Sequence, residues 1–107
     1  MLKRQPGLLL ICATLLLAGT VNAQQGTVII TDENCNYMLL DASVGQVLVK
    51  LIEGEMPRRG DTLSGEFGQR DFSDLTVQSD GSQIQAWIDL VDPNMTKALM
   101  RYRQYCP

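Results

Sequence analysis

Short runs of β-branched or alternating apolar residues recur along most of the chain, and turn residues separate them. These runs predict strands at 27–31, 36–40, 44–52, 62–67, 72–78 and 83–90. The third run alternates, so that two valines and a leucine share one face while Leu48, Lys50 and Ile52 share the other. Because this second face is half apolar, we expect another element to cover part of it.

The last two strands form the clearest local unit. They flank Asp80-Gly81, and this dipeptide predicts a hairpin with a type I′ turn. On the second of these strands Trp87 lies among polar residues. The apolar face of that strand holds Ile84, Ala86, Ile88 and Leu90.

A helix is expected at the C-terminal end. Asp92 is a suitable N-cap and Pro93 suits the first helical position. An apolar stripe at helical spacing follows, made of Met95, Leu99, Tyr102 and Cys106.

The expected fold class is therefore mainly β, in an α+β sense. We expect an OB-like or SH3-like curved sheet or barrel of five to six strands with one C-terminal helix. The alternative is a flat antiparallel sheet with the helix across one face.

The first 23 residues have the features of a secretory signal peptide. Lys3 and Arg4 precede a short apolar run, and Val21-Asn22-Ala23 places small residues at a cleavage site. The run is too short for a bilayer span, and Ile11 before Cys12 does not suit lipid attachment. We therefore expect residues 1–23 to be removed, leaving one exported domain at 24–107, periplasmic or extracellular, with no stable membrane anchor.

Two cysteines remain after this cleavage, Cys35 and Cys106. An even number in an exported chain favours a disulfide. It would close a loop of about 70 residues and contribute about 4 kcal/mol in the chain-entropy model. The alternative is a pair of free thiols.

Charge and composition exclude several function classes. Loss of Lys3 and Arg4 changes the formal net charge from −3 to −5, which disfavours nucleic acid as a partner. Histidine is absent, which removes the commonest general base and zinc ligand. We accordingly expect no catalytic residues, no metal site and no cofactor, and a protein that is not an enzyme.

Trp87 is the most unusual residue, because the strand pattern directs it to the polar face. One interpretation makes Trp87, Phe67 and Phe72 candidate partner contacts. The favoured interpretation places the Trp87 indole beneath the C-terminal helix, since small domains bury their aromatic residues.

The segment Gly60-Asp61-Thr62-Leu63-Ser64-Gly65 resembles a G-D-x-L-x-G pattern found in small exported bacterial domains of unknown function. The resemblance extends over about half of the expected domain, where Phe72 and Trp87-Ile88-Asp89 occupy matching places. It implies a small β-rich exported domain and carries no activity and no site residues.

These observations favour a non-enzymatic exported binding or interaction module, whose partner is an unidentified protein or small ligand. The first alternative is an inhibitor of a hydrolase, because an acidic domain is attracted to basic enzymes. The second alternative is a hydrolase that uses carboxylates alone. Two carboxylates converging in a concave pocket would favour the enzyme.

Overall fold

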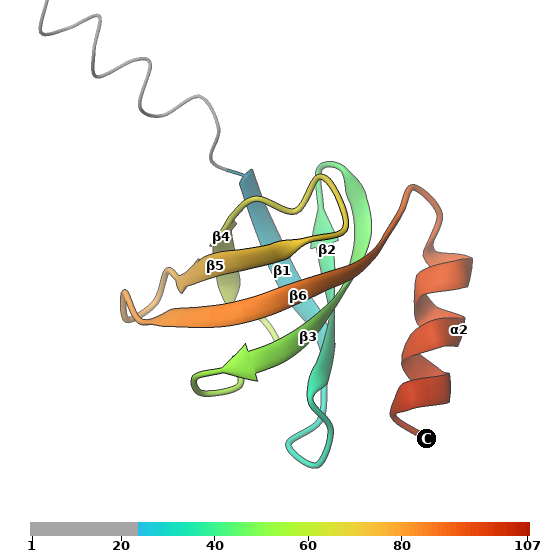
Figure 1. The fold of residues 1–107 in the computed structure, drawn as a ribbon, viewed down its shortest axis with the longest axis horizontal. Coiled ribbons are helices and arrows are strands. Elements are labelled where there is room, and N and C mark those ends of the chain that lie inside the picture. Colours follow the sequence, from blue (N-terminus) through green and yellow to red (C-terminus); the bar gives the residue numbers. More distant parts are fainter. Residues whose placement is uncertain (1–23) are drawn as a thin grey trace, which may run out of the picture.

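The chain folds into a closed antiparallel barrel with a helix packed on its outside (Figure 1). The computed structural model describes residues 24–107, so the expected leader, with Cys12, lies outside the described residues. The strand order around the barrel is β1-β2-β3-β6-β5-β4. The elements are β1 (Gln24–Thr31), β2 (Tyr37–Ala42), β3 (Gly45–Glu53), β4 (Thr62–Gly65), β5 (Phe72–Val77), β6 (Gln83–Asp92) and α2 (Met95–Tyr105).

The expectation of a small, mainly β barrel with one C-terminal helix is confirmed, and the flat-sheet alternative is wrong. The pairing of β1 with β4 closes the sheet on itself, through the register Gln25↔Ser64 and Gly26↔Leu63. Within residues 24–107, no helix combines the length and the apolar character needed to cross a bilayer.

Apolar side chains fill the barrel interior, as the alternating patterns predict. Phe67 is fully buried there and is the largest of these side chains. The other buried members of this cluster are Val28, Met38, Leu40, Val47, Val49, Leu63, Leu75, Val77, Ile84, Ala86 and Ile88.

A second apolar cluster lies outside the barrel, between its wall and α2. It joins Leu39 of β2 and Leu48 of β3 to Ala98 and Tyr102 of the helix. This is the cover expected for the half-apolar face of β3. The helical stripe is rotated from the expected one, since Ala98 and Tyr102 are buried whereas Met95 is 50% exposed.

The helix begins later than expected, because Asn94 and not Asp92 is the N-cap residue. Asp92 still stabilises the helix start. Its carboxylate accepts hydrogen bonds from the backbone amides of Asn94 at 2.9 Å and Ala98 at 3.1 Å. Burial raises the pKa of Asp92, but the bonds from the amides of Asn94, Ala98 and Lys97 outweigh burial and hold the pKa below its ordinary value.

Cys35 and Cys106 lie at disulfide distance, with their Cα atoms 5.8 Å apart and a sequence separation of 71. The pair joins the turn after β1 to the C-terminal end of α2. Beside it, the rings of Tyr37 and Tyr105 stack with centroids 4.5 Å apart. The two contacts fix the helix end against β2.

The β5–β6 hairpin is confirmed, but its turn is not type I′. Gly81 has a φ of +74°, while among the described residues no residue other than glycine has a positive φ. A type I′ turn needs positive φ at both central residues. The amide of Val77 donates to the carbonyl of Ser82, so four residues form the loop instead of two.

A β-bulge in β6 changes which side chains face the helix. Leu48 pairs with Leu90 and Val49 with Ile88, which leaves Asp89 as the extra residue. Leu90 consequently packs with the cluster under α2 and not with the interior side chains of its strand. The expected four-residue apolar face of β6 is therefore wrong at its last member.

Candidate functional site

Four outward-facing side chains form a continuous row across the barrel wall. Direct cross-strand pairs join Tyr37 of β2 to Lys50 of β3, Lys50 to Trp87 of β6, and Trp87 to Phe72 of β5. We call these four residues the outer row. Neighbouring side chains in such a register are close enough to contact each other, so the row presents three aromatic rings and one ammonium group on one surface.

Trp87 lies at the centre of the outer row and is half-buried. Its ring packs against Phe72, with centroids 4.8 Å apart and an interplanar angle of 60°. The guanidinium of Arg70 lies over the indole, 5.5 Å from its centroid. Phe72 itself is 63% exposed, so this aromatic pair faces solvent on one side.

The expectation that α2 covers Trp87 is wrong. The helix packs on Leu39 and Leu48, which pair with each other two residues along β2 and β3 from the Tyr37–Lys50 pair of the outer row. Trp87 is not part of the cluster beneath the helix. The apolar surface that the helix needed is supplied by these two leucines. Trp87 is instead shielded by the side chains of Phe72 and Arg70.

Asp89 is a nearly buried carboxylate beside the outer row, with only 7% of its surface exposed. Its Oδ1 accepts a hydrogen bond from the Trp87 indole N–H at 3.3 Å. Two guanidinium groups approach it, Arg70 at 3.6 Å from Oδ1 and Arg101 of α2 at 3.9 Å from Oδ2. Among the described residues, Oδ2 has no hydrogen-bond partner.

At the other end of the row, Lys50 lies 5.9 Å from the ring centroid of Tyr37. Burial is the main cause that raises the pKa of Tyr37, and the negative charge of Asp89 and the nearby Tyr105 add to it. The Tyr37 hydroxyl therefore stays protonated at neutral pH and remains able to donate a hydrogen bond.

The two flanks of the row differ in charge. On the helix side lie Arg101 and the buried Asp89. On the opposite side the next register position holds Asp74, Gln85 and Glu53, which line a shallow cavity of about 220 Å³. A partner lying across the row meets cationic groups on the helix side and carboxylates on the opposite side.

The three candidate contact residues from the sequence separate in the structure. Trp87 and Phe72 lie together, as described. Phe67 is fully buried in the barrel interior and has no surface to offer a partner. Its ring fills the space beside Gly26, where a Cβ atom would lie 3.4 Å from it, so Phe67 is a core residue and the expectation of a contact there is wrong.

Sequence reasoning missed Arg70, Asp89 and Arg101 as members of the site. Asp89 was visible as a polar neighbour of Trp87, but its burial depends on the bulge and on α2. Arg70 lies in the loop before β5, and Arg101 lies on the helix. Only the tertiary fold brings these three residues to one carboxylate.

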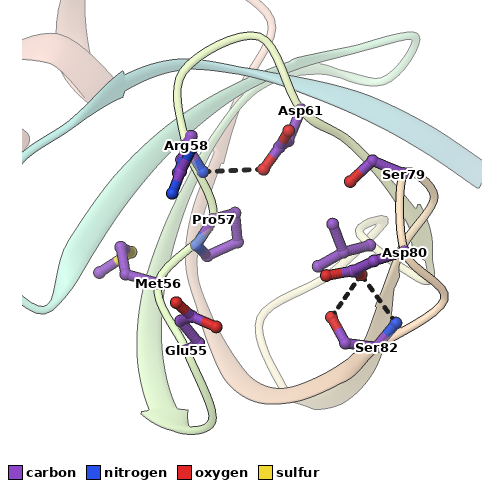
Figure 2. A pocket seen from close by; sticks show the side chains of 9 residues that line it. Glu55, Met56, Pro57, Arg58, Asp61, Ser79, Asp80 and Ser82 are labelled. Atoms are coloured by element: carbon purple, nitrogen blue, oxygen red, sulfur yellow. Dashed lines mark hydrogen bonds between the residues drawn. The ribbon is translucent and has the colours of Figure 1, made fainter.

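A separate polar pocket of about 250 Å³ lies between the β3–β4 loop and the β5–β6 hairpin (Figure 2). Two of its carboxylates are hydrogen-bonded within their own loops. Asp61 accepts from the Arg58 amide at 2.8 Å, and Asp80 accepts from the Ser82 amide at 2.9 Å and the Ser82 hydroxyl at 2.7 Å.

The bonds from the Ser82 amide and then its hydroxyl lower the pKa of Asp80. A general acid needs the opposite shift. The Asp80 carboxylate therefore fits a structural role in its loop better than that of a general acid.

Within residues 24–107, no three side chains of the kinds that bind metals are grouped closely enough to hold an ion. No protein-family model matches the chain, and comparison with curated proteins and with solved structures found no match. The function is therefore argued from the geometry of the site.

Proposed function

We propose that this protein is an exported, non-enzymatic binding module whose contact surface is the outer row. The observation that carries the proposal is the exposed ring of Phe72, 63% accessible and packed on Trp87 at the centre of the barrel wall. Burying this aromatic pair against a partner would remove apolar surface from water, which is a main source of binding energy.

The composition around the pair supports this role. Trp, Tyr and Arg dominate the energetically important positions of protein interfaces, and here Trp87, Tyr37 and Arg70 lie within one surface. The row is also preorganised, because its members lie on strands and contact one another before any partner arrives. Preorganised side chains lose less conformational entropy on binding.

The cysteine pair supports export. Cys35 and Cys106 lie at disulfide distance, and such bonds persist mainly in oxidising compartments outside the cytosol. Export would also explain the charged and apolar start of the chain. Both observations agree with a domain that meets its partner in the periplasm or outside the cell.

Site-specific photocrosslinking in the producing cell tests the proposal. A benzophenone amino acid is placed at Phe72, and in a matched control at Met100, which is 59% exposed on the helix. Crosslinked adducts should form at position 72 and not at position 100. Equal adducts at both positions, or adducts at position 100 alone, would show that the outer row is not the contact surface.

The inhibitor alternative is the case in which the crosslinked partner is itself a hydrolase. Mass spectrometry of the adduct identifies the partner. Addition of the purified domain to that partner then decides whether its activity falls. A partner with no hydrolytic activity would leave the simple binding module as the function.

A further inference from the structure

We propose that Arg70 and Arg101 form a carboxylate-binding site beside Trp87, and that the module recognises an acidic peptide segment carrying an apolar side chain. This inference rests on the proposed function, because it names the chemistry of the partner at the outer row. It begins from the imbalance of charge around Asp89, where one buried carboxylate faces two guanidinium groups.

Neither guanidinium is fully engaged by Asp89. The separations of 3.6 Å and 3.9 Å exceed the roughly 2.7–2.9 Å of a charge-assisted hydrogen bond. The Arg70 side chain is 67% exposed and that of Arg101 is 42% exposed, whereas Asp89 is 7% exposed. The cluster therefore carries a net positive charge, and its unpaired donors are accessible from solvent.

Trp87 restricts where the Arg70 guanidinium can lie. The indole supports the guanidinium from one side and also donates its N–H to the same Asp89 oxygen that attracts Arg70. An arginine held in this way loses little freedom when it pairs with a carboxylate, and its planar fork matches the two carboxylate oxygens.

The same surface offers an apolar contact next to the cations. Phe72 leans on Trp87 and is largely exposed, while Lys50 follows Trp87 in the row. An acidic side chain over Arg70 and Arg101 would place a neighbouring apolar side chain against Phe72. Carboxylates at Asp74 and Glu53 on the far side of the row would repel a second acidic group there and so orient the segment.

Other anionic partners fit less well. A long polyanion such as nucleic acid would be repelled by the formal charge of −5 that residues 24–107 carry. A neutral sugar brings no charge to pair with the two partly engaged guanidinium groups, and Arg70 lies over the indole face on which it could stack. A short acidic segment carries few charges and satisfies both the arginines and the exposed ring.

Trp87 is the only tryptophan of the chain, so its fluorescence reports directly on the site. The mature domain is titrated with the capped peptide Gly-Glu-Phe-Glu-Gly, and separately with the same peptide carrying Gln or Lys in place of both Glu residues. We expect a saturable change in emission with the Glu peptide, at a dissociation constant of about 1 mM or below, as for a single weak contact. The Gln and Lys peptides should bind at least about tenfold more weakly, as for a lost charge-assisted hydrogen bond.

Variants locate the effect. Arg70→Gln and Arg101→Gln should each weaken binding of the Glu peptide by about tenfold, as for a lost charged hydrogen bond. Arg103→Gln, an exposed arginine of the last helical turn, should leave binding within about twofold, because it changes only the long-range charge. Arg70→Lys keeps a counter-charge for Asp89 but loses the planar fork. It should also weaken binding, which preserves the test if Arg70→Gln fails to fold.

Several results would overturn the inference. The first is a titration with the Glu peptide that gives no saturable change in emission. The second is a Gln peptide that binds as tightly as the Glu peptide. The third is an Arg103→Gln variant that loses as much affinity as Arg70→Gln and Arg101→Gln. Sodium acetate at the same carboxylate concentration should change the Trp87 emission less than the Glu peptide does. An equal change with acetate would refute the claim that the site recognises a peptide segment. Crosslinking at position 72 without binding of the Glu peptide would refute this inference and leave the proposed binding module intact. Binding of the Glu peptide without crosslinking at position 72 would refute only the proposed contact in the cell.

Discussion

Replacement of Trp87 distinguishes a core residue from a surface residue that also orders its neighbours. Trp87→Ala removes the packing with Phe72, the surface beneath Arg70 and the donor to Asp89. Trp87→Phe retains one aromatic ring and removes the second ring of the indole together with its N–H. The two variants therefore separate the contribution of the retained ring from that of the N–H and the ring that carries it.

The magnitudes follow from these contacts. An aromatic pair contributes about 0.5–1.5 kcal/mol beyond its buried area, and an exposed cation–π contact contributes about 0.5–1 kcal/mol. The bond to Asp89 is long at 3.3 Å, so its loss costs about 1–2 kcal/mol, at the low end for a buried charged acceptor. Because these terms overlap, we expect about 1–2 kcal/mol for Trp87→Phe and about 2–3 kcal/mol for Trp87→Ala.

These values lie below the roughly 3–5 kcal/mol typical of a fully buried aromatic residue. Thermal melts followed by circular dichroism measure them, since each kcal/mol shifts the Tm of a domain this size by about 4–8 °C. A Trp87→Ala melt within about 2 °C of wild type would refute the reasoning, because Asp89 would then not need the indole. Equal losses for both variants would show that the single ring that phenylalanine retains contributes nothing to stability.

Three further predictions concern the rest of the domain. The double variant Cys35→Ser/Cys106→Ser should lose about 4 kcal/mol of unfolding free energy in a urea titration, from the loop of 71 positions, and a loss below about 1 kcal/mol would contradict the chain-entropy argument. Because the folded pKa of Asp92 is lowered, its stabilisation is present above the ordinary pKa of about 3.9 and disappears as the pH falls through the folded value. Asp92→Asn should therefore melt below wild type at pH 7, and a gap that persists unchanged at about pH 2 would exclude the carboxylate charge as its cause. Phe67→Ala should cost about 3–5 kcal/mol and Phe72→Ala about 0.5–1.5 kcal/mol in urea titrations, and equal costs would contradict their different burial.

Most of the barrel was predictable from local pattern. Alternation placed all six strands to within a few residues, because a strand with one buried face must carry apolar residues at every second position. The half-apolar face of β3 also predicted a cover, and the cluster joining Leu48 to Ala98 and Tyr102 is that cover. The local pattern did not predict on which part of the barrel surface the helix packs.

The errors have specific physical causes. The bulge at Asp89 shifts the alternation by one position, so that Leu90 packs under α2 and Val91 packs against the interior. Because both residues are apolar, the sequence pattern does not show this shift. The helix starts at Met95 with Asn94 at the cap position, and the Asp92 carboxylate accepts from the amides of Asn94 and Ala98 from two residues before the cap. Phe67 lies in the loop after β4, yet its ring is buried in the barrel interior.

The outer row illustrates a limit that applies to all antiparallel sheets. Its four residues come from four strands, and only the cross-strand register aligns them. Trp87 and Phe72 were candidate contacts, but Tyr37 and Lys50 had the pattern of ordinary strand residues. Sequence identified Trp87 as unusual because it broke the local pattern, but the neighbours that give Trp87 its role are distant in the chain.

The placement of Asp89 supports the proposal that this surface binds a partner. A buried carboxylate with one oxygen lacking a hydrogen bond is costly, and replacing a whole buried ion pair by apolar side chains is often neutral or stabilising. An apolar residue at this bulge would also extend the cluster beneath α2. Local choices that oppose stability are concentrated at functional sites. Asp89, which attracts Arg70 and Arg101 while leaving both partly free, fits that description better than any other buried polar residue of the domain.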